Sequence, residues 1–318
     1  MGLKIVEPGL LTTIQDNGRN GFQSYGFSVS GAMDALAMKL ANVLVNNDEN
    51  EAVLEMSFLG PTITFEKNVI IAITGANMSP KINQSSIPLG KPVFVNSGDT
   101  LQLRTAKKGV HSYLAVKGGF DIAKTLGSAS TSMNAKIGGI SGNKLEALDS
   151  IPINKESHYR SFNWMLSHEW LNYMNSTPII HFITGRQYNW FTESAKQTFI
   201  SKSYQVTPKS NRMGYRLDGP GLALNKQMEL LSEGTTFGTI QVPPNGKPIV
   251  LMADRQPTGG YPKFGQVIQT DLPKLSQLRP NQPFYFKQVS LDESVRWLFN
   301  HHYKLSKLRA FINLKWKE

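Results

Sequence analysis

Short runs in which apolar and polar residues alternate, separated by glycine and proline turns, dominate the first half of the chain. A period of two, carried by β-branched and aromatic residues, is typical of strands that bury one face. We therefore predict strands over residues 3–6, 62–65, 69–74, 93–95, 100–104 and 112–116.

One segment of the first half has a helical period instead. Apolar residues between Ala35 and Leu44 recur at every third or fourth position, capping groups precede them in residues 30–34, and Asn46 and Asn47 follow. Ser, Asp and Asn are favoured at the ends of helices. This segment is therefore predicted to be a helix.

The strand pattern resumes in the second half, after a polar and aromatic stretch without a clear period at about residues 149–177. Strands are expected at residues 178–184, 215–217, 239–242, 249–252, 266–268 and 284–289, with a helix near 191–200. Apolar residues from Val295 to Leu308 favour a helical tail. The predicted organisation is mainly β, with an N-terminal domain (1–155), a linker (156–176), a C-terminal domain (177–290) and a helical tail (291–318).

Composition narrows the class of protein. At 318 residues the chain exceeds what one hydrophobic core usually serves, which agrees with two domains. It has no cysteine, so disulfides and thiolate sites are excluded. Neither a signal peptide nor a run of about 18 apolar residues is evident. We expect a soluble, cytoplasmic protein with no membrane attachment.

The charge balance is strongly basic, with a formal net charge of +11 and a pI near 9.6. Such a balance suits nucleic acid, a membrane surface or an anionic small molecule. The basic residues are scattered except near the C-terminus, and no aromatic and basic motif of a nucleic-acid module is present. We therefore expect a small-molecule substrate and no nucleic acid.

Several familiar catalytic motifs are absent. The chain has no Walker-type phosphate loop, no Gly-x-Ser-x-Gly and no His-Glu-x-x-His, and its six histidines lack metal-ligand spacing, so no metal site is predicted. Residues 37–40, Ala-Met-Lys-Leu, are similar to a biotin attachment motif. They lie within the predicted helix, where Lys39 is a solvated side chain, so no covalently bound biotin is expected.

Two polar segments of the first half are candidates for ligand binding. In the first, one short loop offers the amide of Gln15, the carboxylate of Asp16 and the guanidinium of Arg19, which suit a carboxylate or phosphate. Ser30 and Asp34 follow it, and the sequence leaves open whether they bind a ligand or only cap the helix. The second segment combines residues 116–120 with 126–131, where paired glycines and small hydroxyl residues suit an anion but are also common in turns.

Two further segments lie in the second half. Residues 210–217 contain Arg212 and Tyr215 and lead into the strand predicted over 215–217; arginines near a buried strand favour anion recognition or a salt-bridged rim. The last segment combines residues 232–234, 238–244 and 253–263. There, the strand over 249–252 leads into a polar Gly-Gly turn, an arrangement that presents side chains to a ligand while the backbone comes close. The candidate residues of this last segment are Glu233, Gln241, Asp254, Arg255, Gln256, Thr258, Gly259, Gly260 and Lys263.

These same segments resemble the family that contains the 5-oxoprolinase C subunit, the Kip inhibitor antagonist of bacilli and the carboxyltransferase half of urea amidolyase. The resemblance extends from Glu7 to about Val289. It rests on residues 13–16, 18–19, 30–34, 41–42, 54–55, 74–76, 212–217, 232–234, 254–256 and 258–263. It implies two tandem cyclophilin-like β-barrels.

The resemblance also implies a reaction and partners. The family's implied activity is the ATP-dependent opening of 5-oxo-L-proline to glutamate, with ATP and Mg²⁺ shared with a B subunit that is similar to the Kip inhibitor and with an A subunit. From side-chain chemistry, Asp254, Glu233 and Lys263 are the catalytic candidates. Arg212, Arg255 and Lys263 suit anions, and Gln15, Gln241 and Gln256 suit a lactam or carboxylate.

Two positions depart from the pattern of the family. Ala129 stands where an arginine is usual, and Pro257 stands where a threonine is usual, which restricts Gln256. Either change is compatible with an altered substrate or with reduced activity. Two alternatives to a 5-oxoprolinase component remain open, namely carboxyl transfer from carboxybiotin on a separate protein and a non-catalytic antagonist of a kinase-inhibitor protein.

Overall fold

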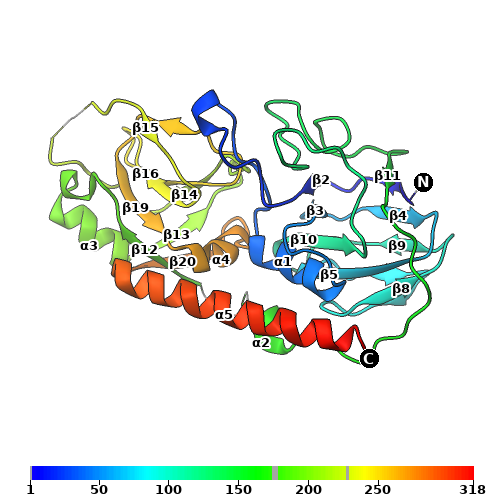
Figure 1. The fold of residues 1–318 in the computed structure, drawn as a ribbon. Helices are drawn as coiled ribbons and strands as arrows, with labels where there is room; N and C mark the ends of the chain where they lie inside the picture. Colours follow the sequence, from blue (N-terminus) through cyan, green and yellow to red (C-terminus); the bar gives the residue numbers. More distant parts are fainter. Residues whose placement is uncertain (1, 174–177, 227–228) are drawn as a thin grey trace. The chain divides into compact units, whose positions relative to one another are not determined.

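The computed structural model describes residues 2–173, 178–226 and 229–318. The chain is mainly β with few helices, as predicted, and it divides into two compact units (Figure 1). The first unit contains Met1–Asn20, Ser30–Met174 and Lys307–Glu318, and the second contains Gly21–Val29 and Asn175–Ser306. The stretch expected to be a linker therefore lies in the first unit as far as residue 173, and its remainder lies outside the described residues.

The strands of the first unit form two sheets. The six-stranded sheet has the order β11 (Ser150–Pro152), β1 (Gly2–Glu7), β4 (Thr62–Phe65), β9 (Thr100–Gln102), β6 (Lys81–Ile82) and β7 (Ser85–Ser86). The five-stranded sheet has the order β2 (Leu11–Gln15), β3 (Val53–Ser57), β10 (Lys108–Val116), β5 (Val69–Asn77) and β8 (Val93–Val95). Neighbouring strands are antiparallel, and β10 pairs with β5 in a register that sets Tyr113 opposite Thr74.

Several of the strands that alternation predicted bury one face and expose the other. The inward positions of β1, β4 and β9, among them Leu3, Ile5 and Ile63, are buried in one core while their neighbours reach solvent. Helix α1 (Ala35–Leu44) packs against β10 and β5. It begins after Asp34, whose carboxylate accepts a hydrogen bond from the backbone N–H of Ala37 at 2.9 Å. Lys39 lies within this helix and reaches Glu49 at 3.7 Å.

The second unit contains a closed barrel. Its strands follow the order β12 (Ile179–Thr184), β19 (Lys263–Val267), β16 (Thr239–Gln241), β17 (Ile249–Leu251), β14 (Gly214–Asp218), β13 (Ser203–Val206) and β20 (Pro283–Gln288). Closure leaves the barrel without a free edge. A separate short ladder joins β15 (Glu233–Gly234) to β18 (Thr258–Gly259).

Aromatic side chains fill the centre of this barrel. Phe199 of α3 (Glu193–Ser201) stacks on Phe286 at 4.3 Å between ring centroids and lies 4.4 Å from Phe264 and 5.1 Å from Phe182. Such rings bury a large area and favour edge and offset contacts. The remaining helices are α2 (His168–Leu171), α4 (Leu272–Ser276), α5 (Leu291–Lys315) and the 3₁₀ turns η1 (Gln23–Tyr25), η2 (Tyr188–Trp190) and η3 (Gln269–Asp271).

Every strand and helix predicted from the sequence is present, with ends that differ by a few residues. The helical tail is α5. A closed barrel is found in the second unit, whereas the strands of the first unit form two sheets. The strands β2, β3, β11 and β13 and all two-residue strands were not predicted.

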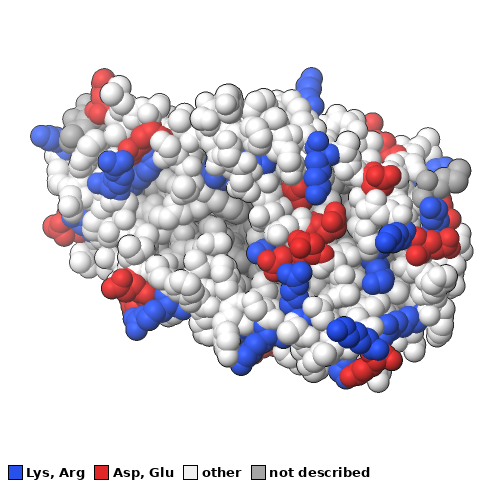
Figure 2. Space-filling model, in the orientation of Figure 1, with Lys and Arg blue, Asp and Glu red and all other residues white. Residues whose placement is uncertain are grey.

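Two further expectations concern the surface. No helix in the described part of the chain is both long and apolar enough to cross a membrane. On the face shown in Figure 2, Lys and Arg side chains lie among Asp and Glu, so the net positive charge forms no continuous basic area there. Within residues 2–173, 178–226 and 229–318, no three His, Asp or Glu side chains group as metal ligands would.

Candidate functional site

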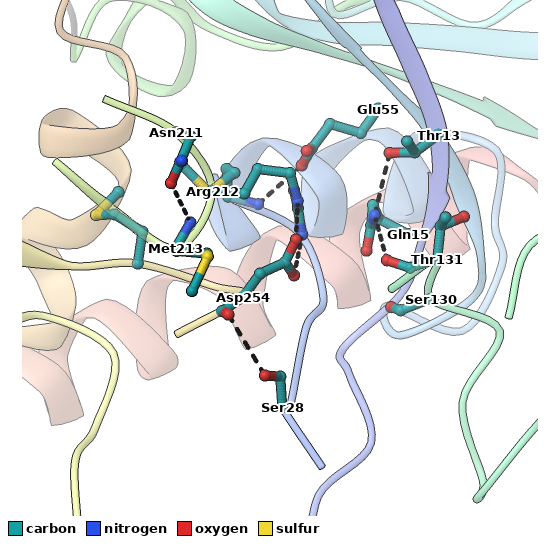
Figure 3. A network of polar contacts seen from close by, with 12 residues as sticks. Thr13, Gln15, Ser28, Glu55, Ser130, Thr131, Asn211, Arg212, Met213 and Asp254 are labelled. Atoms are coloured by element: carbon teal, nitrogen blue, oxygen red, sulfur yellow. Dashed lines mark hydrogen bonds and ion pairs between the residues drawn. The ribbon is translucent and has the colours of Figure 1, made fainter. Parts of the chain in front are cut away.

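Asp254 lies shortly after strand β17, and its carboxylate binds the guanidinium of Arg212, which lies shortly before β14 (Figure 3). Arg212 Nε donates to Asp254 Oδ2 at 2.8 Å, and Arg212 Nη2 donates to Oδ1 at 3.0 Å. Arg212 and Asp254 are buried, with 6% and 5% of their surface exposed. This two-point geometry is the strongest form of ion pair in proteins. The predicted catalytic acid and the predicted anion-binding arginine therefore bind each other.

Arg255, the next residue, is held differently. Its side chain is 8% exposed, and its Nε has no hydrogen-bond partner among the described residues. Burial lowers the pKa of Arg255 to about 10. The backbone is fixed because Ser28 Oγ donates to the carbonyl of Arg255 at 2.9 Å. A buried guanidinium with an unused donor suits an anionic ligand.

Lys263 begins strand β19 and binds Glu233. Lys263 Nζ lies 2.6 Å from Glu233 Oε1, which also accepts from Gln187 Nε2 at 3.0 Å. Gln187 in turn accepts from the backbone N–H of Lys263 at 3.2 Å. The ammonium of Lys263, bonded to the Glu233 carboxylate, lowers the pKa of that carboxyl. The two catalytic candidates therefore form one ion pair.

The β15 and β18 ladder brings the Gly-Gly turn against Gln241. Glu233 is paired with Gly259 and Gly234 with Thr258. A Cβ atom on Gly259 would lie 2.4 Å from Gln241 Nε2, so any side chain at this position would displace the amide. Gln241 is 5% exposed, and its Nε2 has no partner within the described chain. It is a second buried donor available to a ligand.

A cavity of about 1060 Å³ lies beside this turn in the second unit. Its walls include Gly260, Tyr261, Val242 and Leu230. Small-molecule sites are typically concave pockets with apolar walls and a few placed polar groups. The cavity is therefore large enough for a small substrate.

Three other predicted residues lie elsewhere in the second unit. Tyr215 is buried, and its hydroxyl donates to the carbonyl of Ser276 at 2.9 Å, which anchors α4 to the barrel. The side chains of Gln256 and Thr258 are exposed. The carbonyl of Gln256 accepts from Thr235 Oγ1 at 2.6 Å, and this bond fixes the turn that precedes Gly259.

In the first unit, Asp16 is the centre of a hydrogen-bond cluster. Its Oδ1 accepts from Gly18 N at 2.8 Å, Ser128 Oγ at 2.6 Å and Ser130 Oγ at 2.5 Å, and its Oδ2 accepts from Ala129 N at 2.7 Å. A carboxylate offers about four lone-pair positions. Asp16 therefore holds two loops together and has little capacity left for a ligand.

Gln15 and Thr131 lie next to this cluster and keep unused polar atoms (Figure 3). Gln15 Nε2 donates to Thr13 Oγ1 at 3.0 Å and to the carbonyl of Thr131 at 3.2 Å. Gln15 Oε1, Thr131 Oγ1 and Ser30 Oγ are buried without a partner in the described residues. Arg19 is 1% exposed and donates to the carbonyl of Ser130. A buried polar atom without a partner is costly, so these atoms suit an ordered water or a ligand.

Asp34 has a structural role in addition to any ligand role. One oxygen caps α1, the other accepts from the hydroxyl of Tyr173, and its N–H donates to Tyr113 at 2.8 Å. Tyr113 also donates to Glu55 Oε2 at 2.7 Å. Complete burial, followed by the adjacent Glu55 charge, raises the pKa of Tyr113 well above its usual value.

Comparison with known proteins identifies the family. Residues 25–288 match the family model described as "Carboxyltransferase domain, subdomain A and B". The chain belongs to this family. Among its relatives are the 5-oxoprolinase C subunit of Escherichia coli, 37% identical over 99% of this chain and 98% of its own, and that of Haemophilus influenzae, 35% identical over 95% and 96%.

A solved structure confirms the fold of the carboxyltransferase family. The crystal structure of the urea amidolyase of K. lactis matches with a TM-score of 0.91 at 24% sequence identity. The match covers 96% of this chain and 20% of that much longer protein.

The structure also shows polar residues that our sequence reasoning left out. Gln187 connects Glu233 to the backbone of Lys263, and its signal was the polar run that directly follows strand β12. Glu55 lies in the middle of a buried strand, where a charged residue is unusual. Ser128 and Ser130 were expected to bind an anion or to belong to a turn, and in the structure they bind Asp16.

Proposed function

We propose that this member of the carboxyltransferase family is the C subunit of an ATP-dependent 5-oxoprolinase, acting with a B subunit and an A subunit in the cytoplasm. The observation that carries the proposal is the 37% identity to the E. coli 5-oxoprolinase C subunit across nearly the whole of both chains. The function is a hydrolase activity on a cyclic amide, and the chain contributes part of the site.

The residues of the second unit suit an activated lactam. Transfer of the γ-phosphoryl group of ATP to the lactam carbonyl oxygen would release ADP and activate the carbonyl carbon towards water. Addition of water and cleavage of the C–N bond would give an acyl phosphate and a free amine, and a second water would release phosphate and the carboxylate. Arg255 Nε and Gln241 Nε2, both buried without partners in the described residues, are donors for the oxygens that gain negative charge. The Glu233 and Lys263 pair can hold or transfer one proton at its 2.6 Å contact.

The carboxylates of the second unit do not suit a magnesium ion. Asp254 is bound to Arg212 and Glu233 to Lys263, so neither carboxylate is available as a metal ligand without breaking an ion pair. We therefore assign magnesium to the partner subunits.

The test is a reconstitution. The chain is mixed with its B and A subunits, and ATP-dependent release of glutamate from 5-oxoproline is measured. Arg255→Met is expected to lower kcat/KM by roughly 100-fold, because removal of one buried donor to developing charge costs about 10² to 10³ in rate. The matched control is Arg216→Met, since Arg216 is an exposed arginine of β14. No glutamate release from an intact ternary complex would contradict the proposal.

The name of the family model favours a second candidate, carboxyl transfer from carboxybiotin to an amide. The biotin would come from a separate protein, because Lys39 lies within α1 and is not presented on a hairpin turn. Incorporation of labelled bicarbonate into urea, with a biotinyl protein supplied, distinguishes this activity from glutamate release.

A further inference from the structure

A cavity of about 930 Å³ in the first unit collects positive charge away from the residues discussed above. Five Lys and Arg residues line it against two acidic residues. The basic residues are Lys117, Lys155, Arg160, Arg309 and Lys317, and the acidic residues are Asp48 and Glu156. Lys117 belongs to the Gly-Gly segment whose sequence suited an anion, and the proposed reaction does not use it.

The backbone around Lys117 is fixed from both sides. Its N–H donates to the carbonyl of Ile70 at 2.8 Å. Asn47 donates to the carbonyl of Val116 at 2.8 Å and accepts from the N–H of Gly118 at 2.8 Å. Gly118 has a φ of +84°, which favours glycine. The lysine therefore enters the cavity from a rigid turn.

The opposite wall is equally ordered. Lys117 Nζ lies 3.9 Å from the ring centroid of Trp316, whose indole N–H donates to the carbonyl of Leu44 at 3.1 Å. Arg160 lies 5.0 Å from the same ring and donates to the carbonyls of Lys315 and Trp316 at 3.1 and 2.8 Å. These bonds close the C-terminal end of α5.

Most of the cations that line this cavity form no ion pair with a carboxylate of the described chain. Lys117, Lys155 and Lys317 form no ion pair or side-chain hydrogen bond within the described residues. Asp48 lies 3.9 Å from Arg309, and Glu156 accepts from the backbone N–H of a loop residue, Asn68, at 3.3 Å. Four of the five cations are therefore without a carboxylate partner within the described residues, because Arg160 also donates only to backbone carbonyls.

The groups that face Lys117 also affect its protonation. Burial, followed by the nearby charges of Arg160 and Lys155, lowers the pKa of Lys117. An anion in the cavity would offset this repulsion, because an opposite charge within a few ångströms favours the protonated amine.

We propose that this cavity is a binding site for a compact oxyanion of the phosphate or pyrophosphate type. Three unpaired ammonium groups line one cavity, and each can donate hydrogen bonds to the oxygens of such an anion. Hydrogen bonds fix the backbone around Lys117 and the end of α5 at Trp316, so little backbone order is lost on binding. Trp316 already packs against Lys117, Arg160 and Phe162, so its ring lines the cavity. The cations therefore recognise the ligand through its phosphate oxygens.

The experiment is calorimetric titration of the full chain with inorganic phosphate, pyrophosphate and ADP at constant ionic strength. Constant ionic strength removes general screening from the comparison. We expect pyrophosphate to bind and to change the fluorescence of Trp316, a change that Trp316→Phe abolishes. Binding of pyrophosphate without ADP identifies a free oxyanion, whereas equal binding of ADP identifies a nucleotide phosphate, and both results support the site.

Lys117→Met and Lys155→Met are each expected to weaken pyrophosphate binding by about tenfold or more, because each removes a charge-assisted hydrogen bond to the anion. The matched control Lys81→Met, at an exposed lysine of β6 in the same unit, should bind as the unaltered chain does. If Lys117→Met fails to fold, the exposed Lys155 decides the question alone. Unchanged binding in a folded variant overturns the proposal, and so does binding of RNA that pyrophosphate does not displace.

Discussion

The buried pair of Arg212 and Asp254 predicts a large and specific loss of stability when it is broken. Asp254→Asn keeps the volume of the side chain but removes its charge, and it sets an amide NH₂ against one of the two N–H donors now 2.8 and 3.0 Å from the carboxylate. The two residues are only 6% and 5% exposed, so water cannot replace the lost bond. Removing one partner of such a pair costs about 3–5 kcal/mol.

The assay is urea unfolding of the full chain, followed by fluorescence and circular dichroism. Asp254→Asn should lower the free energy of unfolding by about 3 kcal/mol. The double variant Arg212→Met with Asp254→Leu should recover most of this loss, because apolar residues of similar volume often replace a buried pair without cost. The coupling in the double-mutant cycle completed by the single variants Arg212→Met and Asp254→Leu should therefore be at least about 2 kcal/mol.

An exposed pair of the same unit is the control. Lys247 Nζ lies 3.3 Å from Asp218 Oδ1, with 46% and 69% of the side chains exposed. Asp218→Asn should cost less than about 1 kcal/mol, and high salt should remove even that. A loss below about 1 kcal/mol for Asp254→Asn, or a double variant that shows only the sum of the two single losses, would refute the reasoning.

Three more predictions follow from the same contacts. Lys263 lowers the pKa of Glu233, so the ionised Glu233 stabilises the folded chain above pH 4.5, and this stabilisation is lost as the pH falls through the folded pKa. In acid titrations, the difference in the free energy of unfolding between the unaltered chain and Glu233→Gln should therefore shrink. Arg255→Met should raise the free energy of unfolding by about 1 kcal/mol at pH 7, because the buried charge is unfavourable, and this advantage should fade in alkaline titrations as the pH rises above the folded pKa of about 10. Ser130→Ala removes a hydroxyl that donates to Asp16 and accepts from its N–H, and thermal unfolding should show a loss of about 2 kcal/mol; a change below about 0.5 kcal/mol would contradict the role given to Asp16.

The sequence predicted most of the fold where one face of a strand is buried and the other is exposed. Strand β3 was not predicted because all five of its residues are buried, Glu55 and Ser57 among them. Its buried positions therefore do not alternate with exposed ones. Strand β2 ends in the buried Gln15 and has the same difficulty. The two-residue strands are too short for any period.

The sequence located the polar segments of the site but not the contacts between their side chains. Arg212 and Asp254 are 42 positions apart, and Gln187 and Lys263 are 76 apart. Composition alone shows a cation and a carboxylate as two separate candidates for ligand contact. Only the folded barrel shows that they bind each other, because residue pairing over such separations depends on how the strands are arranged.

These pairings change which residue is expected to recognise an anion in the second unit. The sequence placed Arg212, Arg255 and Lys263 on equal terms, but Arg212 is bound to Asp254 and Lys263 to Glu233. An anion that approached either would compete with a carboxylate already within 2.8 Å. Arg255 is buried and has a lowered pKa, and its Nε has no partner among the described residues, so a ligand oxygen there would add a hydrogen bond that these residues do not supply. Of the three cations, Arg255 is therefore the one that we expect to recognise an anion.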